Sequence, residues 1–465
     1  MSAAETGVVD VSDSARAALT GLVSTYAASR PGWDVAPVRL LEAEMLAPGR
    51  PGIVDVVAEL GDRVVHVVFG LRASAEDAPF IPDGDDVVVG SLVDDDGAAV
   101  VVDATRDPVV AAMLLERVSG EVVEPSLVHH LRDDKGSVTL AMEDRIAFTV
   151  YNEVVDGPRP DLELFLALDE VGFNHLAAPL AVWRRSGRDL GMAQEYLAGA
   201  SSGYALALTS VRDLYASGGP PELAGGDFGA EAHRLGTMTA RMHLGLDKAF
   251  GRRPGDVGAW AVGIEEALRP LSPHILERPD VEDLLVELRA LQVTSQAIRT
   301  HGDFHLGRTC RTEQGWYVVD FDTGGRPTSM AGTVPKTDTV PKTDTVPKTG
   351  TAPKTGTAPD ADTAPDTDDG GPVFRSPLAD VADMLWSLDH VATNAADERD
   401  PSGRDGLSEL ADAWVARNRR AFLAGYLGVP GISGLVPPGR EALRILTASF
   451  ELVRAAVHQA RLSEN

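Results

Sequence analysis

Cysteine is nearly absent from this sequence of 465 residues, in which Cys310 is the only one. A single thiol excludes an internal disulfide and any metal site built from clustered cysteines. No run of about 18 apolar residues occurs, and this excludes a helix that spans a membrane. The first twenty residues are acidic and lack a basic stretch followed by an apolar one, so they do not resemble a secretory signal. We therefore expect a cytoplasmic protein, in keeping with the reducing environment that a lone thiol fits.

Positive charge is also scarce. The 42 Lys and Arg residues face 70 Asp and Glu residues, and the formal net charge is −28. Nucleic acid and anionic membranes are therefore poor partners, because both attract proteins of the opposite sign. The acidity would attract a cationic substrate, although a solvated acidic surface is the simpler interpretation. The hydrophobic fraction of 44% is ordinary for a globular protein and is enough to fill a core.

Strands are predicted in the first part of the chain and helices in the rest. Val-rich runs at 53–60 and 63–71 flank Gly61-Asp62, which is a strong hairpin signal. Further strands are predicted at 86–92, 98–103, 137–142, 145–151, 180–183 and 191–197, with a short β segment at 299–322. Helices are predicted at 22–28, 107–118, 161–168, 205–217, 228–249, 258–270, 280–297, 377–395, 407–427 and 439–461. This order indicates an α+β fold.

Six consecutive hexads occupy residues 333–368, beginning TVPKTD and ending TAPDTD. A proline at every sixth position blocks both a helix and a central strand. Few apolar groups are present, so burial cannot offset the entropy lost on ordering. We predict a disordered insertion at 331–372 between two folded pieces, and the repeated proline argues against a stacked β-solenoid.

The densest chemical signal lies in residues 299–327. His301-Gly302-Asp303 is followed after seventeen residues by Asp320, within the run VVDFD. Phosphoryl transfer needs one carboxylate to orient a hydroxyl group and accept its proton, and another to hold Mg²⁺ on the phosphates. We predict that Asp303 is the base and Asp320 a metal ligand, with ATP and Mg²⁺ as cofactors.

HGDFHLG and VVDFD resemble two motifs of the aminoglycoside phosphotransferases, H-G-D-x-H-x-G and D-F/W-E/D. More narrowly, the chain resembles actinobacterial maltokinase-like enzymes and glucosamine kinases. MAQEYL at 192–197, the helix at 227–242, SPLADVA at 376–382 and AFLAGY at 421–426 are similar to segments of that group. The resemblance implies a bilobal protein-kinase-like fold with a cap domain at 1–105. It implies a nucleotide-binding subdomain at 106–200 and a C-lobe at 201–330 that resumes at 373–465.

The resemblance also implies a nucleotide site made of Lys135, Ser137, Glu163, Gln194, Glu195, Leu197 and Arg308. One departure concerns the phosphate-positioning lysine, since Thr149 stands at its expected place and leaves Glu163 without its expected partner. Lys135 lies in the turn expected to cover the phosphates and is one candidate to replace that lysine. A solvated charge is the commoner role of such a lysine.

A second departure lies five residues beyond Asp303. The family has Asn or Gln there as a neutral ligand to magnesium, whereas this chain has Arg308. A guanidinium has no acceptor atom and cannot bind a metal, but it could contact phosphate directly. Either His305 or Asp322 could complete the metal shell, and Asp322 is favoured because Mg²⁺ prefers oxygen. These losses also leave open a pseudokinase that binds ligands without turnover.

The substrate is expected to be a sugar or amino sugar. The departures from the maltokinase pattern and the acidic composition favour glucosamine, phosphorylated at O6. Maltose phosphorylated at O1 is the alternative, followed by an aminoglycoside. A monomer and a homodimer are both compatible with the sequence. The candidate substrate contacts are His305, Asp389, His390, Trp414 as a stacking platform, and Asn418 one helical turn later.

Overall fold

The computed structural model describes residues 9–10, 13–30, 33, 36–74, 87–94, 97–133, 136–224, 226–271, 273–321, 373–399 and 406–464. Three features named above lie outside these residues: Lys135, Asp322 and the hexad repeat. The chain divides into two units, and the first holds residues up to Glu163 together with Ala177–Ala200. The second holds Leu164–Leu176 and the described residues from Ser201 onward. No helix in the described ranges is long and apolar enough to cross a membrane.

An antiparallel six-stranded sheet begins the first unit, in the order β1-β2-β3-β4-β6-β5. The predicted hairpin is confirmed: β3 and β4 pair from Leu60 opposite Arg63, and Gly61 adopts a φ of 64° in the turn. Both strands are buried almost throughout, and this explains their continuous Val runs in place of an alternating pattern. The strands are β1 (Val9–Asp10), β2 (Val38–Ala47), β3 (Gly52–Leu60), β4 (Arg63–Arg72), β5 (Val88–Asp94) and β6 (Gly97–Asp103).

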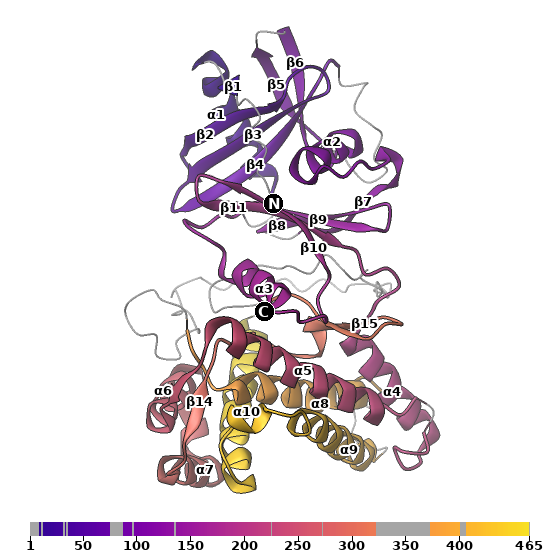
Figure 1. Cartoon of the computed structure of the whole chain (residues 1–465), viewed down its shortest axis with the longest axis vertical. Helices are drawn as coiled ribbons and strands as arrows, with labels where there is room; N and C mark the ends of the chain where they lie inside the picture. Colours follow the sequence, from indigo (N-terminus) through magenta and orange to yellow (C-terminus); the bar gives the residue numbers. More distant parts are fainter. Residues whose placement is uncertain are drawn as a thin grey trace, which may run out of the picture. The chain divides into compact units, whose positions relative to one another are not determined.

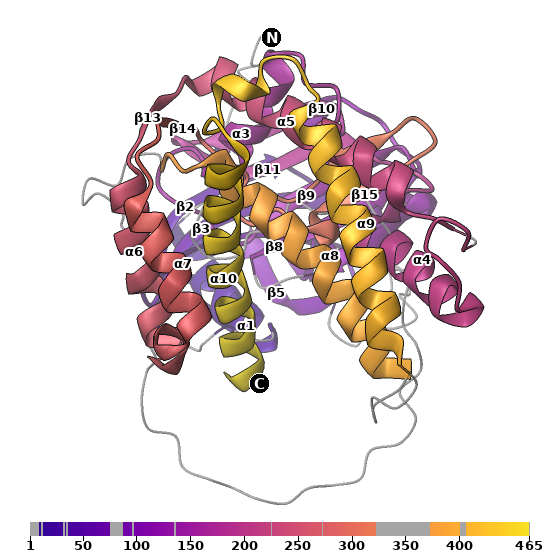
Figure 2. The same ribbon diagram turned by 90° about the horizontal axis from the view of Figure 1, so that it is seen from below.

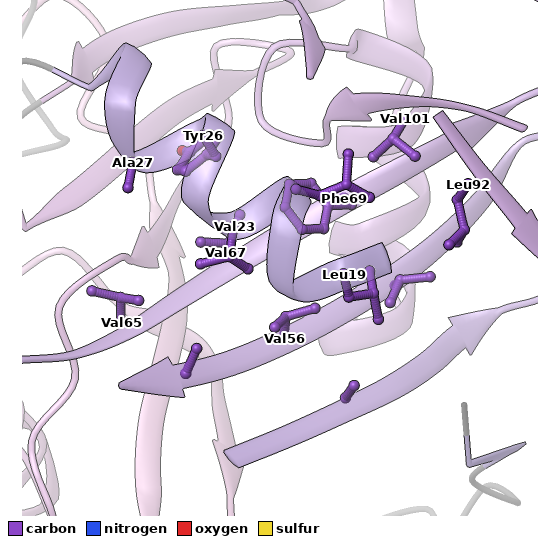
Figure 3. Close-up of a cluster of buried hydrophobic side chains, with 14 of the residues drawn as sticks. Leu19, Val23, Tyr26, Ala27, Val56, Val65, Val67, Phe69, Leu92 and Val101 are labelled. Atoms are coloured by element: carbon purple, nitrogen blue, oxygen red, sulfur yellow. The ribbon is translucent and has the colours of Figure 1, made fainter. Parts of the chain in front are cut away.

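Helix α1 (Asp13–Ser29) covers one face of this sheet through Leu19, Val23 and Tyr26 (Figure 3). The Tyr26 ring meets Phe69 of β4 edge-on, with 6.1 Å between ring centroids. Helix α2 (Pro108–Ser119) contributes to a separate buried cluster with residues of β8 and β9. Its start is fixed by Asp107, whose carboxylate accepts hydrogen bonds from two backbone N–H groups. Ile53 of β3 and Val68 of β4 belong to this second cluster, so both faces of the first sheet are covered by apolar side chains.

A second antiparallel sheet completes the first unit, in the order β10-β11-β9-β8-β7. Thr149 lies on β9 and shares a hydrogen bond of 3.0 Å with Thr139 of β8. The departure from lysine is therefore accommodated by a buried pair of hydroxyl groups. The strands are β7 (Val128–Asp133), β8 (Ser137–Met142), β9 (Ile146–Tyr151), β10 (Pro179–Arg185) and β11 (Arg188–Glu195), and helix α3 (Pro160–Glu170) follows β9.

Long helices make up most of the second unit (Figure 1). Helix α8 runs between α9 and α10 and packs against both (Figure 2). Helix α5 packs along α9, and α6 and α7 pack against α10. The helices are α4 (Gly203–Ser217), α5 (Gly229–Phe250), α6 (Val257–Leu271), α7 (Pro279–Ala290), α8 (Pro377–Arg399), α9 (Leu407–Leu427) and α10 (Arg440–Glu464).

Short strands connect these helices. The predicted hairpin around Gln314-Gly315 is present as β15 (Thr309–Arg311) and β16 (Trp316–Val318), with β12 (Ser201–Ser202) beside β15. The predicted helix at 280–297 is wrong in its last turns, because α7 ends at Ala290. Two β-branched residues follow, and Ser295–Ala297 forms β14, which pairs with β13 (Arg253–Gly255). The β14 strand leads directly into the loop that carries Asp303.

Two glycines allow α5 and α9 to approach closely. A Cβ atom at Gly425 would lie 2.0 Å from the carbonyl oxygen of His233, and one at Gly236 would lie 2.0 Å from that of Phe422. We expect Gly425→Ala to lower the free energy of unfolding by about 1–3 kcal/mol or more, because backbone must move. Gly21→Ala is the control, since no heavy atom of the described residues lies within 4 Å of a Cβ added at that position. Thermal melting should show a lower Tm for Gly425→Ala alone, and equal melting of both variants would contradict the prediction.

Candidate active site

The loop from His301 to His305 lies between β14 and the short 3-10 helix η3 (Leu306–Arg308). The imidazole of His305 caps η3 by accepting a hydrogen bond from the Gly307 N–H at 3.1 Å. This capped turn reverses the chain, so that Arg308 returns to face Asp303. Local backbone geometry therefore brings the basic Arg308 into direct contact with the acidic Asp303.

The carboxylate of Asp303 is surrounded by cations. Arg308 donates to Asp303 Oδ2 from Nη2 at 2.9 Å and from Nε at 3.2 Å. Arg454, from α10, donates to the other oxygen, Oδ1. His305 Nε2 lies 3.4 Å from Oδ2. Both oxygens of the proposed base thus carry a guanidinium partner, one of which comes from 151 residues further along the chain.

These partners set the charge of Asp303. Burial alone would raise its pKa, but His305, Arg454 and Arg308 outweigh burial and hold the pKa well below the usual range. The pKa of His305 is lowered, mainly by burial and further by the two arginines, although Asp303 opposes the change. At neutral pH the group is therefore an ionised carboxylate between two arginines, with a neutral imidazole beside it.

Asp320 joins the same cluster. It follows β16, is 2% exposed, and has a φ of 55°, a left-handed conformation that is uncommon for a residue other than glycine. Arg308 Nη1 donates to Asp320 Oδ2 at 3.0 Å while Nη2 of the same guanidinium holds Asp303. The structure therefore brings together the two aspartates that the sequence predicted to act together, with Arg308 between them.

A buried aspartate on α8 supports the loop from behind. Asp380 accepts hydrogen bonds from the backbone N–H groups of His301 at 2.8 Å and Gly302 at 3.1 Å. Its Oδ2 also lies 3.0 Å from Nε2 of His243, whose Nδ1 meets the hydroxyl of Tyr426 at 2.9 Å. Burial would raise the pKa of Asp380, but His243 and His301 lower it, so the carboxylate stays ionised. Helices α5, α8 and α9 thus fix the loop through one charged group.

His301 connects two segments of the site from within the core. Burial lowers its pKa to about 4, so the imidazole is neutral at physiological pH. Its Nε2 lies 3.3 Å from the carbonyl oxygen of Val319, and its ring stacks on Phe321 with 4.8 Å between centroids. This histidine therefore links the Asp303 loop to the segment that carries Asp320.

The structure corrects two of the predicted substrate contacts. Trp414 is 1% exposed, donates its indole N–H to Ser210, and stacks on Phe228 at 5.9 Å. It offers no free face to a sugar, since both its ring and its N–H are used in the core. Asn418 is fully buried, and its amide donates to the Trp414 carbonyl oxygen at 2.8 Å. Helical spacing could not distinguish this buried face from one that lines a site.

The two candidates on α8 are in different surroundings. Asp389 pairs with Arg419 at 2.6 Å, and Arg419 also holds Glu451 of α10 at 2.8 Å. His390 stacks on Trp386 at 4.6 Å and meets His458 at 4.4 Å. Arg454 lies 5.0 Å from the Trp386 ring centroid, so the α8 aromatic residues extend the cluster around Asp303. Burial, His458 and Arg454 lower the pKa of His390 to about 4.

The remaining described candidates belong to the first unit. Ser137 begins β8 and is buried, whereas Glu163 is an exposed residue of α3. Gln194 and Glu195 end β11, and Leu197 follows them. The Gln194 side-chain oxygen is buried without a hydrogen bond to any described residue. Their nucleotide contacts remain predictions.

Sequence reasoning missed Arg454, Asp380 and His243. Asp380 lies in the SPLADVA run, which was noticed as a family resemblance without a role for the aspartate. A carboxylate in the first turn of a helix could have suggested contacts with nearby backbone N–H groups. Arg454 carries no local signal, because its place beside Asp303 depends on how α10 packs on α8.

The donor atoms of the described residues do not fit a pair of magnesium ions. In protein kinases one ion is held by the metal-loop aspartate and another also by a neutral residue of the catalytic loop. Asp320 supplies a carboxylate, but Arg308 stands at the second position and has no acceptor atom. No group of three His, Cys, Asp or Glu residues in the described ranges could hold a metal. Among the described residues, Asp320 therefore offers one carboxylate at this place, and a guanidinium stands where a second metal ligand would be expected.

Known proteins resemble this chain in sequence and in fold. A glucosamine kinase from Streptacidiphilus jiangxiensis is 31% identical over 314 residues, which are 62% of this chain and 69% of that protein. A solved glucosamine kinase in complex with glucosamine, ADP and inorganic phosphate has a TM-score of 0.59 and 21% identity, covering 95% of this chain and 94% of that one. Its crystal form B has a TM-score of 0.59 and 21% identity, covering 95% of each chain. No protein-family model matches the sequence.

These similarities confirm the predicted α+β, kinase-like fold. The structural likeness covers 95% of the chain. The sequence similarity covers less of the chain than the structural similarity. It nevertheless identifies the narrower group of enzymes that the motifs had indicated, the glucosamine kinases.

Proposed function

The chain belongs to the glucosamine kinase family and is an ATP-dependent phosphotransferase that acts on a sugar hydroxyl, and from this premise we propose that it phosphorylates glucosamine at O6. The observation that carries the chemistry is the convergence of Asp303 and Asp320 on one guanidinium, that of Arg308. The observation that favours an amino sugar is the excess of negative charge, −28 for the chain.

Asp303 is proposed to orient the acceptor hydroxyl and take its proton. The O6 oxygen forms a bond to the γ-phosphorus of ATP while the bond from that phosphorus to the β–γ bridging oxygen breaks. ADP leaves, and the proton of the hydroxyl passes to the Asp303 carboxylate. A carboxylate with a low pKa is a weak base, so its main contribution is to hold the hydroxyl in line with the phosphorus, as expected where leaving-group departure dominates the transition state.

Asp320 is proposed to hold Mg²⁺, with Asp322 as a second oxygen ligand. The ion, when bound, neutralises charge on the phosphate oxygens. Arg308 contacts the phosphates from the same cluster, since its five donors suit phosphate oxygens. The proposed nucleotide contacts in the first unit are Lys135, Ser137, Glu163, Gln194, Glu195 and Leu197.

Asp389 is proposed to recognise the amine of the substrate, with His305 and His390 beside the sugar. Asp389 and Glu451 share one guanidinium, that of Arg419, so the trio carries one negative charge in excess. Burial raises the pKa of Asp389 to about 6, opposed by Arg419 and assisted by Glu451. The carboxylate is therefore ionised at pH 7.5 and can pair with an ammonium group.

Initial rates of ADP release with glucosamine, glucose, maltose and kanamycin test this proposal. We expect kcat/KM for glucosamine to exceed that for glucose at least about 100-fold, because glucose would leave the amine-binding carboxylate unpaired. Phosphorus NMR of the product should show a phosphomonoester coupled to the two C6 protons. A higher kcat/KM for maltose or kanamycin would contradict glucosamine as the substrate, as would phosphate at another position.

A further inference from the structure

Two guanidinium groups hold opposite oxygens of Asp303, and one of them also reaches Asp320. Arg308 donates to Asp303 at 2.9 Å and to Asp320 at 3.0 Å, while Arg454 bonds Asp303 from α10. The positive charges of the two arginines equal the negative charges of the two aspartates. The cluster is therefore electrically balanced before any nucleotide or metal ion arrives.

Arg308 lies where a bridging cation would be expected. Its guanidinium touches both the proposed base and the proposed metal ligand, and it occupies the sequence position from which a neutral side chain holds the second ion in protein kinases. Two guanidinium groups carry the charge of one divalent cation. They also supply directed N–H groups that match the oxygens of a phosphoryl group, as a bare ion does not.

Arg454 has donor capacity left over in this arrangement. Its Nε is buried and makes no hydrogen bond to a described residue, and Oδ1 of Asp383 lies 4.0 Å from it. The guanidinium lies 5.0 Å from the ring centroid of Trp386, and this contact keeps it beside Asp303. A buried N–H group without an acceptor destabilises the fold. An anion that accepts a hydrogen bond from it removes this cost, and the affinity for the anion rises accordingly.

We propose that Arg308 and Arg454, the arginine pair, replace one of the two divalent cations of kinase-type phosphoryl transfer. In this proposal the pair binds oxygens of the terminal phosphate, and the chain with bound nucleotide takes up one divalent ion, at Asp320. The phosphate competes with Asp303 for the arginine pair, which leaves the carboxylate free to meet the acceptor hydroxyl. The inference deepens the proposed function and rests on its assignment of Asp303 and Asp320.

Electron paramagnetic resonance counts the ions directly, with Mn²⁺ as the probe and a non-hydrolysable ATP analogue as the nucleotide. We expect one bound Mn²⁺ per wild-type chain and two per Arg308→Asn chain, because asparagine restores a neutral oxygen ligand. Arg308→Lys keeps the charge and should still bind one. Two ions on the wild-type chain would overturn the proposal, and so would a single ion on Arg308→Asn.

Nucleotide affinity without metal gives a second readout. Calorimetry in excess EDTA should show that Arg454→Gln weakens binding of the metal-free analogue at least about tenfold. Arg444→Gln is the matched control, since Arg444 also lies on α10 and, among the residues that the structure describes, pairs at the surface with Glu441 and Glu287. Equal affinities of Arg454→Gln and the wild-type chain would contradict the proposal. No sugar is present in either experiment, so both outcomes are independent of the substrate assignment.

Discussion

An Asp303→Asn variant is expected to release ADP about 10²–10⁴ times more slowly than the wild-type chain with the best sugar substrate. The amide keeps the shape of the carboxylate but cannot take a proton from the acceptor hydroxyl. It also leaves Arg308 and Arg454 without the charge that both contact. The loss should fall on kcat, because the interaction with the reacting hydroxyl is strongest in the transition state.

Two further variants make this result specific to position and charge. Asp303→Glu retains the charge but moves the carboxylate by one methylene group, so we expect a large loss of kcat here as well. Asp280→Asn is the control, since Asp280 lies exposed in the first turn of α7 and pairs with Arg278. Its rate should equal that of the wild-type chain. Turnover of Asp303→Asn within tenfold of the wild-type chain would contradict the role given to Asp303.

Local signals carried most of the fold prediction. The β3–β4 hairpin was predicted because Gly61 can adopt a positive φ and Val runs flank it. Helices α4, α5, α8 and α9 were found within a few residues of their observed ends, since their apolar residues follow the helical period. The convergence of Asp303 and Asp320 was also predictable, because both lie next to the short hairpin β15–β16.

Long-range packing explains what was missed. Strand β2 is rich in Leu, Glu, Ala and Met, which favour helices, and it is a strand because β3 offers it a partner along its length. Trp414 was proposed as a stacking platform because sugar rings stack on indole faces, whereas its burial depends on Phe228 and Ser210, which are distant in the sequence. Arg454 reaches Asp303 only through the packing of α10 on α8. Each of these outcomes depends on contacts between residues far apart in the sequence, so no local sequence pattern could have predicted it.

Asp380→Ala is expected to lower the free energy of unfolding by about 3–5 kcal/mol, which corresponds to a fall in Tm of roughly 10 °C. Removing the carboxylate leaves two backbone N–H groups of the catalytic loop and the His243 imidazole without their acceptor in the core. Because the loop carries Asp303, kcat should fall as well. Thermal melting and ADP release measured on the same preparation would show both effects.

Asp383, one helical turn later on α8, is the matched control, because its pKa is shifted in the opposite direction to that of Asp380. Burial raises its pKa to about 8; Arg454 opposes the change, Asp380 and Asp303 reinforce it, and Arg375 opposes it. An unfolded chain has an Asp pKa of about 3.9, so between these values the folded state holds a proton that the unfolded state has lost. The free energy of unfolding therefore falls as pH rises through this window.

Asp383→Asn removes this titration and should melt with the wild-type chain at pH 4. Above pH 4 its Tm should exceed that of the wild-type chain by a margin that grows up to about pH 8 and then stays constant, because ionisation of Asp383 is then complete in both states. Asp380→Ala should be less stable than the wild-type chain throughout that range, since Asp380 is an acceptor for three donors. The two carboxylates of α8 are thus expected to have opposite effects at pH 8, where Asp380 stabilises the fold and ionised Asp383 destabilises it. A shift of Tm in the same direction for both variants at pH 8 would contradict this expectation.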